Sequence, residues 1–228
     1  MMGTMPDSAS IPLRWTLKYE ADHSPDGRFE MASYLELNKE ITPEETAIKD
    51  QIHRFGLEVL RPIASELDKL PPDQVIAQGS PLWDAFKQAY SLGYHTRSLP
   101  EALGGANFSP LASHIYAEEM GWASADFAIG LGVAPFPFSF GAMSGNPDII
   151  ENIVKPFAED KEARYIGCWA ITEPMHGSDT LHVGQEAFKR PETAFDLQAV
   201  LDGDEWVING QKSAWVSNGT IATHALAF

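Results

Sequence analysis

Trp169-Ala-Ile-Thr-Glu-Pro-Met-His-Gly-Ser178-Asp179 is the segment from which the rest of the fold is most readily predicted. The apolar, β-branched run 165–171 predicts a strand that stops at Pro174, because proline cannot continue a central strand. Gly177-Ser178-Asp179 then supplies a residue free to adopt positive φ, a hydroxyl and an acid. Such a strand end offers backbone N–H groups and a hydroxyl to phosphate oxygens or to the polar edge of a ring. An ordinary turn at a strand end is the alternative interpretation.

Composition indicates a globular protein and argues against two kinds of partner. The chain has 228 residues, of which 44% are hydrophobic and 21% charged, enough for a sizeable core. Its 32 acidic and 16 basic residues give a formal net charge of -16. Because each phosphate contact needs a cation, we expect neither nucleic acid nor an anionic membrane surface as partner.

Cysteine usage and hydropathy suggest a cytoplasmic protein. The single cysteine, Cys168, excludes an internal disulfide and a cysteine-based zinc site, and we expect it to be a small buried hydrophobe. The amino terminus has no basic segment followed by an apolar core, so no signal peptide is predicted. The uncharged stretch 127–147 has the length of a membrane span, but its three prolines and four glycines predict a buried, broken helix instead.

Four helix starts are visible in the first 160 residues. After an irregular lead-in at 1–41, Thr42-Pro43-Glu44-Glu45 predicts an N-cap, a proline at the first helical position and a capping box. An apolar stripe at helical spacing follows and consists of Ile48, Ile52, Phe55, Val59 and Ile63. Pro62 is expected to kink or end this helix. Ser80-Pro81, Ser109-Pro110 and Asn146-Pro147 predict three further starts.

After Arg164 the pattern changes to strands. We predict strands at 165–172, 195–201, 205–208 and 212–217, with a turn at 202–204. Asn209-Gly210 predicts a type I′ turn, which needs positive φ at both residues. The result is an antiparallel meander that places Trp206, Ile208 and Trp215 on one face. Residues 221–228 begin another strand with an apolar edge, so we expect the full protein or a partner chain to continue from there.

The order of these elements and several motifs resemble one family, the acyl-CoA dehydrogenases. Thr172–Asp179 is similar to its T-E-P-x-x-G-S-D loop, and 210–219 to its N-G-x-K-x-W-I-T-N-G hairpin. Leu99–Gly105 resembles its V-P-E-x-x-G-G connector, and Arg61–Asp68 its first-helix ending. Each motif alone is weakly specific, but their order over residues 42–228 is specific.

The resemblance implies an α+β fold, with an all-helical domain followed by an incomplete antiparallel β-barrel domain. The expected division is 1–41 as an irregular extension, 42–160 as the helical domain and 161–228 as a truncated β domain. It also implies FAD as cofactor. The residues expected to contact FAD are Trp169, Ala170, Ile171, Thr172, Gly177, Ser178, Trp215, Val216 and Ser217.

Within that set the resemblance implies individual roles. Thr172 would hydrogen-bond the pyrimidine side of the flavin, and Gly177 and Ser178 would approach the pyrophosphate. Ser178 would also touch the acyl-CoA substrate. Trp215 would pack against the isoalloxazine ring, and Ser217 would offer its hydroxyl near flavin N5.

The implied activity is α,β-dehydrogenation of an acyl-CoA, with electron-transfer flavoprotein as acceptor and a homo- or hetero-oligomer as the complete form. In this family the catalytic carboxylate sits in a C-terminal helical domain. We therefore assign no catalytic base, and we expect this chain alone to be inactive. Two alternatives remain open: a flavin monooxygenase or oxidase of the same fold, and a non-catalytic partner subunit or gene fragment.

The sequence also departs from the family pattern. Met175 and His176 stand where the family usually has small residues, and one extra residue separates Lys212 from Trp215. Ser217 replaces the usual threonine but keeps the hydroxyl. We expect His176 to be an exposed loop histidine without a partner, because its spacing from the next histidine suits no zinc site. Glu173 is expected to be structural and to hold the loop.

Overall fold

A computed structural model of the chain describes residues 41–178, 184–213 and 216–228. Residues 41–228 form one compact unit. The lead-in predicted for 1–40, and the predicted contributions of Asp179 and Trp215, lie outside the described residues.

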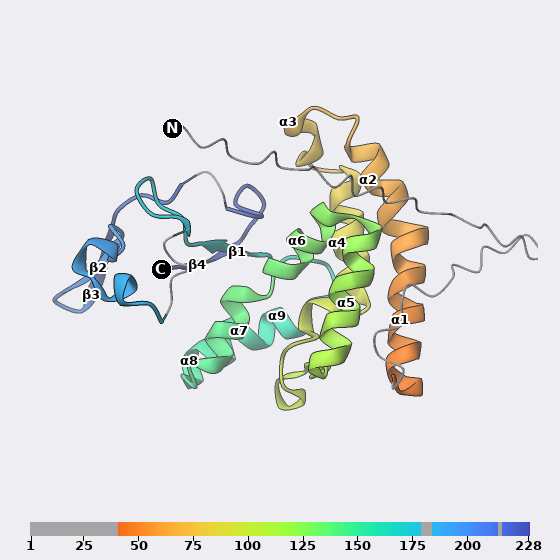
Figure 1. The fold of residues 1–228 in the computed structure, drawn as a ribbon, viewed down its shortest axis with the longest axis horizontal. Coiled ribbons are helices and arrows are strands. Elements are labelled where there is room, and N and C mark those ends of the chain that lie inside the picture. The colour runs from red at the N-terminus through yellow and green to blue at the C-terminus, as the bar shows by residue number, and fades with distance from the viewer. Residues whose placement is uncertain (1–40, 179–183, 214–215) are drawn as a thin grey trace, which may run out of the picture. The chain divides into compact units, whose positions relative to one another are not determined.

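The first part of the described chain is helical. α1 packs beside α5, and α2 beside α4 (Figure 1). The bounds are α1 Pro43–Phe55, η1 Gly56–Leu60, α2 Arg61–Leu67, α3 Pro72–Val75, α4 Pro81–Ser91, η2 Tyr94–Thr96, η3 Glu101–Leu103, α5 Pro110–Ala123, α6 Ala125–Val133, α7 Phe136–Met143, α8 Pro147–Ile149, η4 Ile150–Val154 and α9 Lys155–Ala158.

The four predicted helix starts are confirmed. The Thr42 hydroxyl accepts a hydrogen bond from the Glu45 N–H at 3.2 Å, and the Glu45 carboxylate accepts one from the Thr42 N–H at 2.9 Å. Ser80, Ser109 and Asn146 cap α4, α5 and α8 in turn through their side-chain oxygens. These bonds satisfy N–H groups that have no partner within the helix.

Of the two outcomes predicted for Pro62, a kink or an end of the first helix, the end does not occur, because helical structure continues from Pro43 to Leu67. A π-turn at Gly56–Leu60 precedes the proline, and the Arg61 N–H bonds to the Gly56 carbonyl. The same arrangement recurs at Ile150–Val154, just before Pro156. The wider π pairing re-routes the hydrogen bonds, so the missing proline N–H does not break the helix.

The uncharged stretch is a broken helix, as predicted. α6 ends at Val133, and α7 begins at Phe136 beyond Pro135. Ala125–Met143, with a mean hydropathy of 1.2, could cross a membrane by length and composition alone. Core helices of soluble proteins share those properties. Phe127, Leu131 and Phe138 are buried in the core, but only 33% of the span is buried, so the burial predicted for it holds for one face.

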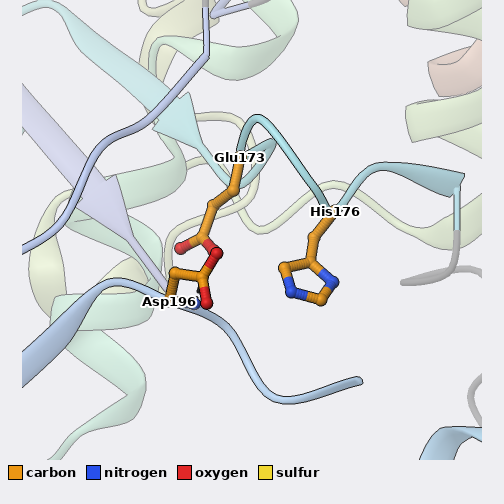
Figure 2. Close-up of side chains that lie close together, drawn as sticks. All are labelled: Glu173, His176 and Asp196. Atoms are coloured by element: carbon orange, nitrogen blue, oxygen red, sulfur yellow. Dashed lines mark hydrogen bonds between the residues drawn. The ribbon is translucent and has the colours of Figure 1, made fainter. Parts of the chain in front are cut away.

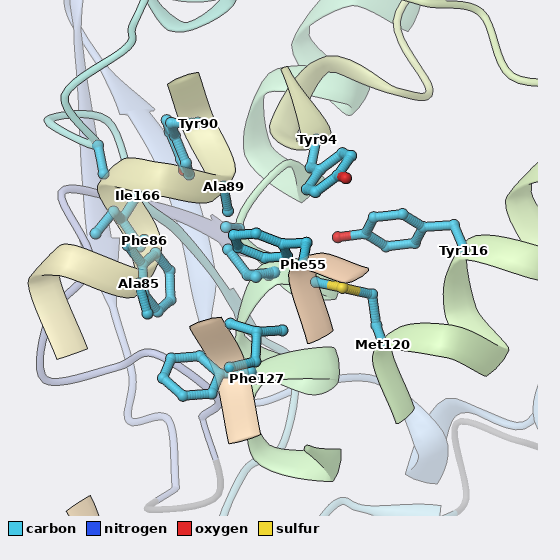
Figure 3. Close-up of a cluster of buried hydrophobic side chains, with 14 of the residues drawn as sticks. Phe55, Ala85, Phe86, Ala89, Tyr90, Tyr94, Tyr116, Met120, Phe127 and Ile166 are labelled. Carbon is cyan, nitrogen blue, oxygen red and sulfur yellow. The ribbon is translucent and has the colours of Figure 1, made fainter. Parts of the chain in front are cut away.

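One aromatic-rich core joins the helices. Ile52 and Phe55 from the predicted stripe are buried, while Ile48, Val59 and Ile63 pack against the core from its margin. Figure 3 shows Phe55 of α1, Tyr94 of η2, Tyr116 and Met120 of α5, and Phe127 of α6 converging. Ile166, which directly precedes the first strand, is also buried in this core at 1% exposure.

The α+β class and the order of helices before strands are confirmed. β1 (Gly167–Ala170) pairs in parallel with β4 (His224–Ala227), and β2 (Gln198–Asp202) pairs antiparallel with β3 (Glu205–Asn209). Two short 3₁₀ turns, η6 Glu186–Lys189 and η7 Pro191–Thr193, precede β2. Cys168 is buried in β1 as expected. The division at residue 160 between two domains stays a prediction.

The predicted antiparallel meander is wrong at its second turn, Asn209-Gly210. Asn209 ends β3 without positive φ, and Gly210 has φ +144°, so no type I′ turn forms. A Cβ on Gly210 would lie 2.5 Å from the Leu197 Cα, so glycine permits a close backbone approach there. Lys212 and Ser213 form no strand; residues 214–215 of the predicted strand lie outside the described residues.

Candidate functional site

Three segments meet around the buried carboxylate of Glu173, which is 2% exposed. Its Oε2 accepts a hydrogen bond from the Asp196 N–H at 2.6 Å, and its Oε1 accepts one from the Leu197 N–H at 2.9 Å. The Lys212 ammonium donates to Oε1 at 2.7 Å and to the Ile171 carbonyl at 3.3 Å. Glu173 therefore ties the loop that follows β1 to the segments that precede β2 and follow β3.

These partners determine the protonation state of Glu173. Burial favours the neutral acid, but hydrogen bonds from Lys212 and from the Leu197 and Asp196 N–H groups outweigh it and hold the pKa of Glu173 below its usual value. The carboxylate is therefore ionised at neutral pH and already paired. The expectation that Glu173 is structural agrees with this geometry.

The loop turns back on itself between Glu173 and His176. The Glu173 N–H donates to the His176 carbonyl at 2.8 Å, and the His176 N–H donates to the Glu173 carbonyl at 3.3 Å. Pro174 suits the position after Glu173 because its φ is preset for a turn. Met175 stands at the tip and is 79% exposed.

The expectation of an exposed, unpartnered His176 is wrong. The turn folds the ring inward to 9% exposure, edge-on to Phe195 at 5.9 Å between ring centroids. Phe195 in turn carries the Lys212 ammonium over its face at 4.5 Å. Packing against Phe195 therefore buries the histidine.

Glu173, His176 and Asp196 lie close together, with metal-ligand-type atoms all within 4.8 Å of one another (Figure 2). The same three residue types can bind a divalent cation. Here, however, Lys212 already supplies a cation to Glu173, and two backbone N–H groups occupy its oxygens. These contacts explain the cluster as an anchor of the loop, without a metal ion.

The strand end carries the first group of predicted site residues. Trp169 projects from β1 with 37% exposure, beside Phe136 and Phe228. Ala170 is buried, and Ile171 and Thr172 are half-buried. A Cβ on Gly177 would have its nearest neighbour 3.9 Å away, at Thr172 Cγ2, so one side of Gly177 is open; Ser178 is exposed.

The second group follows β3. Val216 and Ser217 are half-buried and lead into a turn through Ile221. Asn218 takes a left-handed φ of +64°, and its side-chain amide donates to the Gly130 carbonyl at 2.8 Å and to the Gly167 carbonyl at 3.1 Å. This amide fastens the segment to α6 and to the start of β1.

The segments that carry the two predicted groups are hydrogen-bonded to each other near both ends of β1. The Ser213 N–H donates to the Thr172 carbonyl at 2.8 Å, and Asn218 reaches Gly167. Asn218, and Lys212, which donates to the Ile171 carbonyl and to Glu173, had no role assigned from sequence. The hairpin motif specifies a lysine and an asparagine at these two positions, and this could have indicated a role for them.

The family described as "Acyl-CoA dehydrogenase, N-terminal domain" matches residues 42–160. This match covers more than half of the chain. The chain belongs to the acyl-CoA dehydrogenase family.

Known relatives agree with that assignment. Human mitochondrial short-chain specific acyl-CoA dehydrogenase is 30% identical over 178 residues, which are 76% of this chain and 37% of that protein. A putative acyl-CoA dehydrogenase structure from Mycobacterium smegmatis has 26% identity and a TM-score of 0.61, covering 82% of this chain and 43% of that one. The chain spans about two fifths of the length of the curated relatives it matches.

The same fold also occurs in an oxidase. The nitroalkane oxidase of Podospora anserina is 21% identical with a TM-score of 0.65, covering 80% of this chain and 40% of that one. At this identity the likeness concerns the fold alone.

Proposed function

We propose that the chain supplies the helical domain and part of the β domain of an FAD-dependent acyl-CoA dehydrogenase, which forms a double bond between the α and β carbons of an acyl-CoA thioester. The observation that carries the proposal is the hydrogen bond from the Ser213 N–H to the Thr172 carbonyl at 2.8 Å. It joins the loop motif to the hairpin motif, and the Glu173–Lys212 pair reinforces the junction. Family membership supplies the reaction class.

The residues around this junction fit FAD chemically. Gly177 has an open side, and the exposed Ser178 follows it with a hydroxyl, as a pyrophosphate group requires. Thr172 and Ser217 are half-buried hydroxyl residues, suited to the polar edge of a ring. Trp169 and the hydrophobic residues Ala170 and Ile171 add an apolar border.

Bound FAD would supply the hydride acceptor, and the chain's own residues would bind and orient it. Gly177 and Ser178 would hold the phosphates and, through Ser178, the acyl-CoA. Thr172, Val216 and Ser217 would hold the ring, together with Trp215. We assign no base in the described part of the chain, because the Glu173 oxygens are occupied by Lys212 and two N–H groups.

Anaerobic reduction tests the proposal. The full-length protein that contains this chain, loaded with FAD, is mixed with acyl-CoA thioesters without oxygen, and the visible flavin absorbance is followed. We expect the flavin to bleach, with the 2-enoyl-CoA as product. A flavin-loaded protein that no acyl-CoA bleaches contradicts the dehydrogenase assignment.

The same fold in a nitroalkane oxidase favours a second candidate, a flavin oxidase or monooxygenase. Reoxidation separates the two: an oxidase returns its electrons rapidly to oxygen, whereas we propose electron-transfer flavoprotein as acceptor. We also propose an oligomeric complete enzyme in the cytoplasm.

The chain by itself offers a further test. Since the chain spans only about two fifths of its relatives' length, we propose that FAD binding and activity need segments beyond the aligned part, and that the isolated chain holds little or no stoichiometric FAD. A stable yellow monomer of these 228 residues would contradict that view. A colourless chain that only binds a partner protein would support the alternative of a non-catalytic subunit.

A further inference from the structure

The Lys212 ammonium contacts the backbone of the proposed flavin site as well as its carboxylate partner. It donates to the Ile171 carbonyl at 3.3 Å and to Glu173 Oε1 at 2.7 Å. Only 13% of the Lys212 side chain is exposed, so water screens its charge weakly. A fixed positive charge therefore lies against the strand end that carries Ile171 and Thr172.

One peptide unit connects this charge to the proposed site. The Ile171 carbonyl and the Thr172 N–H belong to the same planar amide and point in opposite directions, so the ammonium lies at one end of it. A cation on the carbonyl withdraws electron density from the amide and makes the N–H a stronger hydrogen-bond donor. In the described part of the chain, the Thr172 N–H has no protein acceptor. This donor is therefore available to a ligand.

The Glu173–Lys212 pair has a fixed orientation. The Glu173 carboxylate also accepts hydrogen bonds from the Asp196 and Leu197 N–H groups at 2.6 and 2.9 Å, which tie its negative charge to the segment that precedes β2. The ammonium, in contrast, reaches the Ile171 carbonyl at the end of β1. The buried pair therefore places its positive end on the strand that would line the flavin.

We infer that Lys212 is a positioning residue that raises the electron affinity of the bound flavin by polarising the Ile171–Thr172 peptide toward the ring. The inference rests on the proposed function, because it needs FAD at this strand end. A ring that accepts a hydride gains electron density, and a positive potential and a strong N–H donor beside it favour that state. Lys212 would thus ease flavin reduction without touching the substrate.

The midpoint potential of the flavin tests this inference, because a charge effect and a loop effect predict different signs. The potential is measured in the FAD-loaded full-length protein against reference dyes, without substrate. Lys212→Met should shift it to more negative values, because the positive charge is lost. Glu173→Gln should shift it to more positive values, because the ammonium loses its counter-charge. A pair that only holds the loop would shift both variants in the same direction or neither.

Three further variants separate the charge from other effects. Lys212→Arg keeps the positive charge and should stay closer to the parent potential than Lys212→Met. Lys189→Met and Glu186→Gln each remove one partner of an exposed ion pair of 3.2 Å and should leave the potential unchanged.

Proton–nitrogen NMR of the purified 228-residue chain tests the polarised peptide without FAD. The Thr172 amide proton should move upfield in Lys212→Met, because loss of the carbonyl contact weakens the polarisation of the N–H. The double variant Lys212→Met with Glu173→Gln should show the same shift. It leaves no unpaired buried charge, so it serves where a single variant fails to fold. An unchanged Ser213 amide signal, which reports the bond to the Thr172 carbonyl, shows that the local fold is kept.

The outcomes separate this inference from the proposed function. Opposite shifts of the potential and an upfield Thr172 signal support the role of Lys212, even if acyl-CoA fails to reduce the flavin. Shifts of one sign, unshifted potentials, or an unmoved Thr172 signal in Lys212→Met overturn it. A protein whose flavin acyl-CoA reduces, but whose two variants shift in the same direction, keeps its proposed function and loses this role of Lys212. A full-length protein that binds no FAD contradicts both.

Discussion

Lys212 and Glu173, 39 residues apart in the chain, form an ion pair of 2.7 Å with side-chain exposures of 13% and 0%. Because the carboxylate also accepts two backbone hydrogen bonds, one pair fixes three segments of the proposed site. The pair thus acts mainly on the geometry of the loop between β1 and Ser178.

Replacing Glu173 tests that coupling. Glu173→Gln leaves Lys212 without its buried counter-charge, and we expect the free energy of unfolding in urea to fall by about 2–4 kcal/mol. Glu186→Gln removes the partner of Lys189 from an exposed ion pair of 3.2 Å. This substitution should change the free energy of unfolding by less than about 0.5 kcal/mol. Equal effects of the two substitutions would contradict the anchor role.

His95 makes stability depend on pH. Burial, with a contribution from Lys161, lowers the pKa of His95 to about 4, and its ring stacks on Tyr90 at 4.1 Å. Unfolding restores a pKa near 6.5, so the unfolded chain binds the extra proton and stability falls as pH drops from about 6.5 to about 4. We expect a loss of about 3 kcal/mol over this range.

Urea unfolding of His95→Phe across the same range measures this loss. The variant keeps a stacked ring without a titrating nitrogen, so its stability should vary less between pH 6.5 and 4. His114→Phe, at an exposed position, should keep the slope of the parent protein. A slope that survives in His95→Phe would assign the acid sensitivity to other groups.

Gly167 is required at the start of β1. A Cβ there would collide with the Ala134 carbonyl oxygen and the Pro137 ring, so we expect Gly167→Ala to lower the free energy of unfolding by about 2–4 kcal/mol. Gly121, within α5, has no neighbour within 4 Å of its Cβ position, and Gly121→Ala should stabilise by up to about 1 kcal/mol. Thermal unfolding of both variants measures this difference in stability. Equal shifts of the unfolding temperature would contradict the requirement for glycine at position 167.

Asn218 combines a left-handed backbone with two side-chain hydrogen bonds. Asn218→Gly should cost about 1–2 kcal/mol, because it loses the amide bonds but keeps the backbone conformation. Asn218→Ala should cost about 1 kcal/mol more, because alanine disfavours positive φ. Denaturant midpoints of the pair measure the difference; indistinguishable midpoints would exclude a contribution from φ.

Ser217→Ala tests the proposed flavin contact in the FAD-loaded full-length protein. Loss of one hydroxyl should slow flavin reduction up to about tenfold without changing the unfolding temperature. Ser213→Ala provides the control, since the bond of Ser213 to the loop comes from its backbone N–H. An unchanged reduction rate and spectrum in Ser217→Ala would remove this residue from the site.

Local chemistry predicted the helical part of the fold well. Helix starts depend on a cap and a proline a few residues apart, so Thr42, Ser80, Ser109 and Asn146 could be read directly. The π-turn that carries helical structure past Pro62 was not predicted, because no local sequence signal used here marks a π-turn. The π-turn at Ile150–Val154, before Pro156, was not predicted for the same reason.

Strand pairing was harder to predict, because it depends on distant residues. β1 and β4 have nothing in their own sequences that selects a parallel partner 57 residues away. Gly210 suggested a hairpin turn, but glycine is needed there because the backbone of Leu197, which precedes β2, lies so close. For the site, Glu173 was identified as structural, whereas the burial of His176 depends on Phe195 and was not foreseen.

The parallel pairing of β1 with β4 also has a consequence for biosynthesis. Gly167 leaves the ribosome well before His224, its register partner, so β1 must wait for its neighbour while the helices can already pack. During that interval Ile166 can enter the helical core and hold the waiting strand in place. A translational pause after β1 has left the ribosome and before His224 has done so would prolong this half-assembled state, with the edge of β1 open to pairing with a neighbouring nascent chain.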